Sequence, residues 1–155
     1  MNSVDRRLLE LGLELPMVNP AQGNYLPYVK AGSLVFVAGQ GPRLAGRLTC
    51  RGVVGRDVTV KQAEDAARLC ALNIVGHVRN ACDGDFDLVK RFVRIAGLVR
   101  CTEDFEDQAK VLNAASDLLC DVFASRGSHA RMASGTHALP SGMAVEIEAV
   151  VELSN

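Results

Sequence analysis

The alternation of apolar and charged residues over 143–153 constrains the fold of this chain most strongly. In a β-strand, successive side chains point to opposite faces, so one face of this segment is predicted to be buried against another layer. The predicted buried face carries Met143, Val145, Ile147, Ala149, Val151 and Leu153, and the opposite face carries Ala144, Glu146, Glu148, Val150 and Glu152. The length of 155 residues favours one domain over residues 1–155, and 48% hydrophobic residues suffice for its core.

Two long segments have the 3.6-residue period of amphipathic helices. The first follows Thr59-Val60-Lys61-Gln62, which matches a capping box, and is predicted to run to about Ala81. The second is predicted to be capped by Thr102, with acidic residues in its first turn and a buried stripe reaching Phe123. A short additional helix is predicted at residues 4–13.

Runs of β-branched and aromatic residues predict the strands between and around these helices. They fall at residues 25–30, 33–38, 92–101, 131–137 and 143–153, with one short hairpin within 43–56. This order indicates an α+β fold in which two long helices cover one face of a single mixed β-sheet.

The predicted strand at residues 33–38 is apolar on both faces, because Leu34, Phe36 and Ala38 alternate with Val35 and Val37. A sheet that has helices on one side and apolar side chains on the other needs a second covering layer. Another copy of the same chain is the simplest cover, so the pattern predicts a homo-oligomer.

Composition and charge exclude several classes of function. The net charge of −1 gives no general attraction for nucleic acid or anionic membranes. No apolar run approaches the roughly 18 residues that a membrane span requires, and the N-terminus lacks the apolar segment of a signal peptide. The five cysteines show no C-x-x-C spacing, which fits free thiols in the cytoplasm. The three histidines have no metal-ligand spacing, so no metal site is expected.

Charged residues in the last quarter of the chain suggest a binding site. Arg131 and Glu146 lie on two predicted strands that a Leu139–Gly142 turn would join as neighbours, and we expect the two side chains to share the face away from the helices. An arginine offers a planar fork for a carboxylate, and a glutamate can hold or activate water. The pair therefore suggests a pocket for a small carboxylic acid. The alternative is an exposed hairpin with solvated charges, which is the commoner arrangement.

The joint order of several short motifs resembles the Rid or YjgF-like family of reactive-intermediate (imine/enamine) deaminases, also labelled endoribonuclease L-PSP. The motifs are Asn24-Tyr25, the Gly32–Gln40 segment followed by Gly41-Pro42, Asn113, Ala130-Arg131, Leu139-Pro140 and Val145-Glu146-Ile147-Glu148. The N-terminal helix, Leu72-Asn73 and His129-Ala130-Arg131 resemble the longer-chain branch of that family. The resemblance covers the chain from about Asn19 to its end.

This resemblance implies a chorismate-mutase-like fold and a homotrimer whose three sheets form a central barrel. The family's pockets lie at the subunit interfaces, and its reaction is the hydrolysis of 2-imino or enamine acids to 2-keto acids and ammonia. The family reaction uses no cofactor. The partners expected here are therefore small 2-imino and 2-keto carboxylates and two further copies of the chain.

The resemblance also assigns roles to single residues. Arg131 falls on the family arginine that binds the substrate carboxylate, and Glu146 on the glutamate that positions the attacking water. Tyr25 falls on the pocket tyrosine, and Gly39 on the glycine whose backbone faces the ligand. Asn113 falls on an asparagine close to the pocket.

Two positions depart from the family pattern. The deaminating branch often has serine where this chain has Ala38, and Ser-Cys where this chain has Met132-Ala133. If the backbone at the cysteine position is what contacts the substrate, Ala133 keeps that contact. The loss of a hydroxyl at Ala38 removes one hydrogen bond, which typically contributes about 0.5–1.5 kcal/mol.

Three functions are compatible with these features to different degrees. The leading hypothesis is an imine hydrolase in which Arg131, Glu146 and Tyr25 form the reactive centre. The second is a trimer that binds small carboxylates without turnover. The third is a ribonuclease or translation inhibitor, which the sequence disfavours because it lacks paired histidines, an aromatic stacking platform and a basic stripe.

Overall fold

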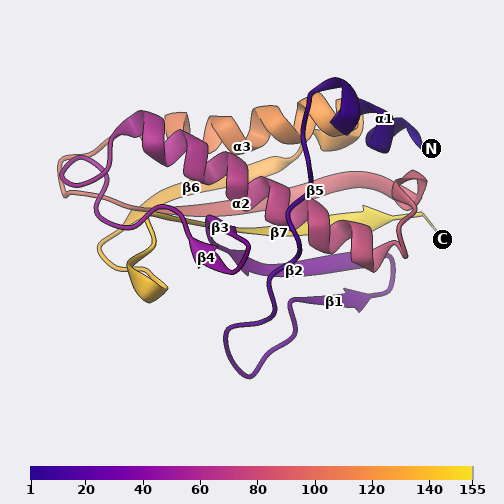
Figure 1. The fold of residues 1–155 in the computed structure, drawn as a ribbon, viewed down its shortest axis with the longest axis horizontal. Helices are drawn as coiled ribbons and strands as arrows, with labels where there is room; N and C mark the ends of the chain where they lie inside the picture. The colour runs from indigo at the N-terminus through magenta and orange to yellow at the C-terminus, as the bar shows by residue number, and fades with distance from the viewer. Residues whose placement is uncertain (155) are drawn as a thin grey trace.

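The computed structural model describes residues 1–154, drawn in Figure 1. Its helices and strands, in chain order, are α1 (Ser3–Glu10), β1 (Tyr28–Ala31), β2 (Leu34–Gln40), β3 (Arg43–Leu44), β4 (Arg47–Leu48), α2 (Val60–Ala81), β5 (Val89–Arg100), α3 (Gln108–Phe123), β6 (Ala130–Thr136) and β7 (Val145–Leu153). Short 3₁₀ turns lie at Phe86–Leu88, Ala124–Gly127 and Pro140–Gly142.

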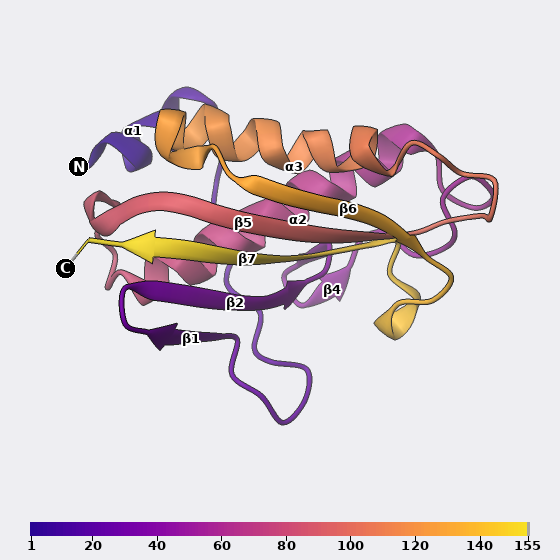
Figure 2. The same ribbon diagram turned by 180° about the vertical axis from the view of Figure 1, so that it is seen from behind.

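Five strands form one mixed sheet in the order β1-β2-β7-β5-β6. Neighbouring strands run antiparallel except for β5 and β6, which are parallel because the chain returns through α3 between them. The helices α2 and α3 lie side by side on one face of this sheet, as the two opposite views in Figures 1 and 2 show. The predicted α+β arrangement with two long helices on one face is confirmed.

The prediction that the last two strands are neighbours is wrong, because β5 lies between β6 and β7. Ile95 of β5 is paired with Arg131 on one side and with Ala149 on the other. Paired residues share a face of the sheet, and Ile95 is fully buried under the helices. Arg131 therefore lies on the helix face, whereas Glu146 is paired with Leu98 and lies on the opposite, open face.

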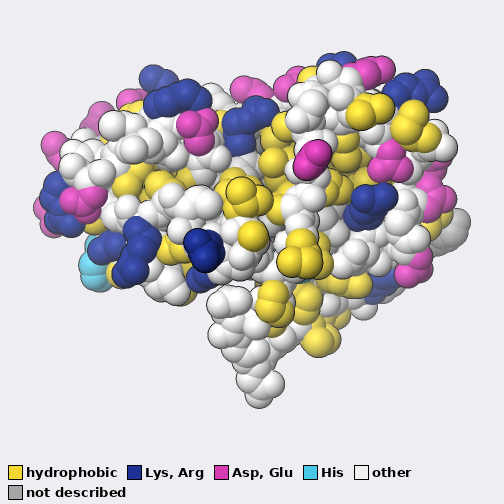
Figure 3. Space-filling model, in the orientation of Figure 1, with side chains coloured by type: hydrophobic (Ala, Val, Ile, Leu, Met, Phe, Trp, Pro, Cys, Tyr) yellow, Lys and Arg dark blue, Asp and Glu magenta, His cyan; other side chains and the backbone are white. Residues whose placement is uncertain are grey.

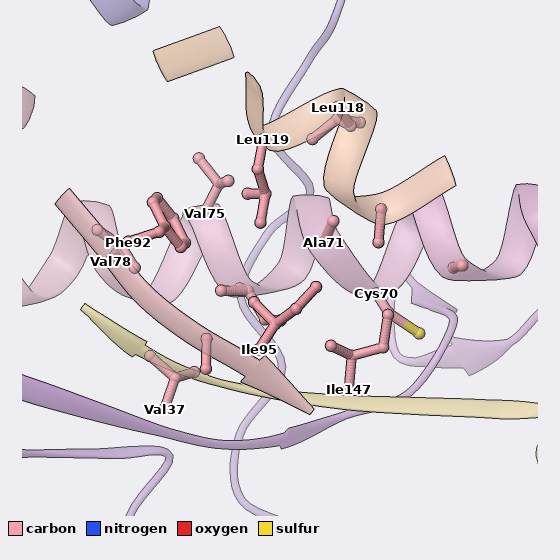
Figure 4. Close-up of a cluster of buried hydrophobic side chains, with 14 of the residues drawn as sticks. Val37, Cys70, Ala71, Val75, Val78, Phe92, Ile95, Leu118, Leu119 and Ile147 are labelled. Atoms are coloured by element: carbon pink, nitrogen blue, oxygen red, sulfur yellow. The ribbon is translucent and has the colours of Figure 1, made fainter. Parts of the chain in front are cut away.

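The core fills the space between the sheet and the two helices (Figure 4). Val37, Ile95 and Ile147 point up from three different strands toward apolar side chains of α2 and α3. α2 begins with the predicted capping box, in which Thr59 and Gln62 bond to each other's backbone N–H groups. The face of residues 143–153 that the alternation predicted to be buried does lie in this core. Ala144, which was predicted on the opposite face, is also buried.

Several predicted boundaries shift. Thr102 does not cap α3, whose N-cap is Asp107. The Thr102 N–H donates to the Val54 carbonyl (3.1 Å), and a turn follows in which the Phe105 N–H donates to the Thr102 carbonyl (3.2 Å). Tyr25 lies in the loop before β1 rather than in the strand. β2 continues through Gly39 to Gln40 instead of stopping at Ala38. α1 ends at Glu10, three residues earlier than predicted.

The open face of the sheet carries apolar side chains, as the two-sided pattern of β2 predicted. Phe36 is 45% exposed and is paired with Val29 on β1 and Val150 on β7. Met132 on β6 is also exposed on this side. Among residues 1–154, no helix has the length and apolar character that crossing a bilayer needs.

A buried histidine makes the stability of this fold depend on pH. His77 of α2 is 1% exposed, and neither ring nitrogen has a hydrogen-bond partner among the described residues. Burial lowers the pKa of His77 below its ordinary value of 6.5. The unfolded chain then binds the proton more readily, so the free energy of unfolding falls as the pH drops through 6.5 toward the folded pKa.

We predict that His77→Leu loses less stability than the wild type between pH 7.5 and pH 5, as measured by urea unfolding. The raised pKa of Glu146 makes the free energy of unfolding rise as the pH falls, and it does so equally in the wild type and in His77→Leu. The difference in pH dependence between the two proteins therefore reports on His77 alone. The exposed His137 supplies the control, because His137→Gln should follow the wild-type pH dependence. Identical pH dependence of the wild type and His77→Leu would contradict the prediction.

Candidate functional site

Three of the predicted site residues line one cavity. Tyr25, Gly39 and Glu146 surround a hollow of about 240 Å³ at the end of β2, together with Arg43 and Ser141. Glu146 also borders a second hollow of about 290 Å³ on the open face of the sheet, beside Met132. The Glu146 carboxylate therefore lies between the loop-lined cavity and the uncovered sheet face.

Gly39 allows the backbone of β2 to approach Glu146 closely. The pairing of β2 with β7 shifts between Val37 and Gln40, where β2 has one residue more than its partner. Such a bulge bends a strand and re-aims its side chains. A Cβ atom at Gly39 would lie 2.5 Å from Glu146 Oε1, so any larger residue would displace the carboxylate. The packing of Glu146 over Gly39 explains why a glycine occupies this position.

The pKa of Glu146 is raised from its ordinary value, first by burial of the carboxyl group and then by the negative charge of Glu148 on the same face. A carboxylate with a raised pKa is a stronger base than one in water. It also accepts and releases a proton closer to neutral pH, which suits general acid–base catalysis.

Buried asparagines hold the two loops that form the wall of this cavity. Asn73 of α2 is fully buried and donates to the carbonyls of Gly41 (3.1 Å) and Arg43 (2.9 Å). Its Oδ1 accepts from Asn19 at the start of the Tyr25 loop (3.2 Å). Tyr25 is 49% exposed, and its hydroxyl oxygen accepts from the Gln22 N–H (3.2 Å). The loops are thus attached to the core through Asn73.

Arg131 and Asn113 form a separate group at the β6 edge of the sheet. Arg131 Nη1 donates to Asn113 Oδ1 (2.8 Å) and to Ser116 Oγ (3.1 Å), and Nη2 donates to the Ala109 carbonyl (3.4 Å). All three acceptors are uncharged and belong to α3. Among residues 1–154, no carboxylate forms an ion pair with this guanidinium. Its positive charge is held in place but is not neutralised.

His129 extends this group by fixing the Ser116 hydroxyl. His129 Nδ1 lies 2.6 Å from the Gly127 carbonyl, and Nε2 lies 3.0 Å from Ser116 Oγ. A carbonyl oxygen can only accept, so Nδ1 carries a proton. In the neutral ring, Nε2 then accepts from the Ser116 hydroxyl, whose oxygen remains free to accept from Arg131. The chain His129–Ser116–Arg131 orients the guanidinium.

The structure brings the predicted site residues together in two groups rather than one. Tyr25, Gly39 and Glu146 line the cavity, whereas Arg131 and Asn113 are bonded at the far edge of the sheet, with Ala133 on the same strand. The expectation that Arg131 and Glu146 share a face is wrong, because Arg131 is paired with Ile95 and Glu146 with Leu98, which point to opposite faces of β5.

Sequence reasoning also missed polar residues in both groups. Ser116 and His129 orient Arg131, and Arg43 and Ser141 line the cavity. Spacing gives a partial signal for Ser116, which follows Asn113 by about one helical turn, whereas His129 lies just before β6, two residues before Arg131. Among residues 1–154, no group of three His, Cys, Asp or Glu side chains is placed to hold a metal ion.

Comparisons with known proteins agree with this architecture. The family described as "YjgF/chorismate_mutase-like, putative endoribonuclease" matches residues 5–152. Protein TCP17 of Trypanosoma cruzi is 41% identical over 98% of this chain and 95% of its own length. The crystal structure of Atu1372 from Agrobacterium tumefaciens is 40% identical, with a TM-score of 0.92 over 98% of this chain and 93% of that one.

A solved structure from Shewanella oneidensis is 36% identical, with a TM-score of 0.94 over 98% of this chain and 100% of its own. The family model matches nearly the whole chain, and the two solved structures are similar to it over almost all of their length. The chain belongs to the YjgF/chorismate mutase-like family.

Proposed function

We propose that the protein hydrolyses reactive 2-imino or enamine acids to 2-keto acids and ammonia, at sites formed between the subunits of a homotrimer. Each site would combine Arg131 and Asn113 of one subunit with Tyr25, Gly39 and Glu146 of its neighbour. The observation that carries this proposal is the uncompensated charge of Arg131, held by three neutral acceptors at a sheet edge.

Two further features support a site shared between subunits. Arg131 and Glu146 lie on opposite faces of one sheet, so a small substrate cannot contact both in a single subunit. The open sheet face beside Glu146 also carries exposed Phe36 and Met132, which favour burial against another copy. In the proposed trimer, covering this face would place a neighbour's edge group beside the Glu146 cavity.

The residues of this composite site can divide the reaction between them. The Arg131 fork binds the substrate carboxylate and fixes the C=N carbon above Glu146. The Glu146 carboxylate accepts a proton from water as the water oxygen adds to that carbon. The protonated carboxyl then returns this proton to the nitrogen of the adduct, which is formed from the protonated imine. Ammonia leaves as the hydroxyl of the adduct gives its proton to the regenerated Glu146 carboxylate and becomes the keto group, and Glu146 releases that proton to solvent. The raised pKa of Glu146 makes its carboxylate a stronger base for the first proton transfer.

A binding trimer without turnover is the second candidate, and it is favoured by Ala38 and Ala133. Ala38 lies on β2 beside Gly39, so the side chain there offers no hydroxyl to the cavity. Both alternatives use Arg131 for the carboxylate, and they differ in whether Glu146 accelerates the loss of an imine.

The histidines do not support RNA cleavage by a pair of acid–base imidazoles. His77 is buried, and both ring nitrogens of His129 are engaged. His137 is the third histidine of the chain, so no second free imidazole remains to pair with it.

We predict that Arg131→Ala remains folded but loses about 2–5 kcal/mol of binding free energy for 2-oxobutanoate, because the bound carboxylate is left without its cation. Isothermal titration calorimetry would measure this loss. Arg131→Lys should recover little, since an ammonium group cannot reproduce the planar fork. The exposed Arg6 of α1 provides a control of equal charge, so Arg6→Ala should bind as the wild type does. Unchanged binding by Arg131→Ala would contradict the assigned role.

We predict that Glu146→Gln abolishes accelerated imine hydrolysis, with a loss of about 10²–10⁴-fold, because an amide cannot accept the proton from water. The assay generates 2-iminobutanoate enzymatically and follows its decay with and without the protein. Keto-acid binding by Glu146→Gln should be retained or tightened, since a negative charge is removed near the bound carboxylate.

Glu152 lies on the same face of β7, away from the cavity, and Glu152→Gln should hydrolyse the imine as the wild type does. Equal acceleration by the wild type and Glu146→Gln would exclude a catalytic role for Glu146. No acceleration by the wild type, combined with intact keto-acid binding, would establish the binding trimer instead.

A further inference from the structure

The cavity beside Glu146 contains a cation that the proposed hydrolysis does not use. Arg43 of β3 lines this cavity, and its Nη2 donates to Ser141 Oγ at 3.4 Å. Within residues 1–154, no Asp or Glu carboxylate forms an ion pair with Arg43. The guanidinium therefore borders the cavity with its charge uncompensated and with most of its donors free.

Arg43 is attached to the core rather than carried on a solvated loop. Its backbone carbonyl accepts from the fully buried Asn73 of α2 (2.9 Å), which also holds the Gly41 carbonyl. Burying an amide is unfavourable unless its hydrogen bonds are formed, and Asn73 forms them with this segment and with Asn19. The first residue of β3 is consequently fixed relative to β2, which fixes where the Arg43 side chain begins.

A second donor, the Ser141 hydroxyl, lies beside Arg43 in the lining of the cavity. Ser141 has a left-handed backbone conformation (φ 57°, ψ 12°), which is unfavourable for a residue with a Cβ atom. This conformation places the Ser141 hydroxyl next to Arg43. Lys and Arg side chains gather on the side of the molecule where the β3–β4 hairpin and the turn before β7 lie (Figure 3). Arg100, for example, donates to the Gly142 carbonyl in that turn (3.2 Å).

Arg43 is not engaged in neutralising Glu146. The two residues line the same cavity but form no ion pair in the described structure. The pKa of Glu146 is raised by burial and by Glu148, whereas a guanidinium in contact would lower it. The charge of Arg43 thus remains available to a ligand.

We propose that Arg43 and Ser141 bind a second, distal carboxylate of the substrate, so that the site prefers 2-imino dicarboxylic acids to aliphatic 2-imino acids. This inference rests on the proposed function, in which the first carboxylate is bound by Arg131 and the C2 atom lies at Glu146. The substrate side chain then extends into the cavity, toward Arg43. A guanidinium and a hydroxyl together provide N–H and O–H donors for a carboxylate. An aliphatic chain would leave these donors without an acceptor.

The test compares two keto acids with five carbons each. 2-Oxoglutarate and 2-oxopentanoate differ in having a carboxylate or a methyl group at the distal end. Their dissociation constants are measured by calorimetry for the wild type, Arg43→Ala, Arg131→Ala and Arg47→Ala. Arg47 lies on β4 of the same hairpin, is exposed and does not line the cavity, so Arg47→Ala matches the charge change of Arg43→Ala.

The proposal predicts that the wild type binds 2-oxoglutarate roughly 10- to 100-fold more tightly than 2-oxopentanoate, the range expected for a charge-assisted hydrogen bond. In Arg43→Ala the ratio of the two dissociation constants should fall to about one, whereas Arg47→Ala should keep the wild-type ratio. Arg131→Ala should weaken both ligands.

Equal binding of the two acids by the wild type, or an unchanged ratio in Arg43→Ala, would overturn the role of Arg43. The proposed function would still stand in that case, provided that 2-oxopentanoate binds and loses affinity in Arg131→Ala. If neither acid binds to the wild type, both the proposed function and the inference fail.

Discussion

The parallel pairing of β6 with β5 is the constraint on which the functional arrangement depends. Because α3 returns the chain to the same end of the sheet, β6 occupies the outer edge and β5 separates it from β7. The register pairs Arg131 with Ile95, so Arg131 faces α3, and it pairs Glu146 with Leu98, so Glu146 faces the open side. One subunit therefore carries the Arg131 guanidinium at its sheet edge and the Glu146 carboxylate on its open face. In the proposed function, the two groups act on one small molecule from different copies.

Both groups depend on polar contacts that the core supplies. Asn73 is buried in the middle of α2, where an apolar residue would be expected, and it holds the β2–β3 segment and the Tyr25 loop. At the other end of the sheet, Ser116 interrupts the apolar residues of α3 and, together with His129, orients Arg131. In each case a polar residue on a core helix positions the wall of a site, and no charge is buried to do so.

The sequence predicted the elements better than the site. The helical period of apolar residues was sufficient to predict α2, and the apolar–polar alternation was sufficient to predict β7 and its buried face. Both patterns depend on the direction of neighbouring side chains and on their burial. The start of α3 could not be predicted, because a turn follows Thr102, whose N–H donates to the carbonyl of Val54, almost 50 residues away in the chain. The neighbours of β6 could not be predicted either, since a short Leu139–Gly142 turn is equally compatible with a hairpin and with a connection across β5. Arg43 and Ser141 carry no motif, and only the folded cavity brings them together.

Complementation between two inactive variants tests the shared site most directly. Arg131→Ala and Glu146→Gln subunits, each expected to be inactive alone, are unfolded together, refolded and assayed for imine hydrolysis. Mass spectrometry establishes that mixed trimers form. In an equal mixture, about one site in four receives an intact Arg131 from one subunit and an intact Glu146 from its neighbour. We therefore expect about a quarter of the wild-type activity. Mixed trimers that remain inactive would show that Arg131 and Glu146 do not act across a subunit interface, and would contradict the account.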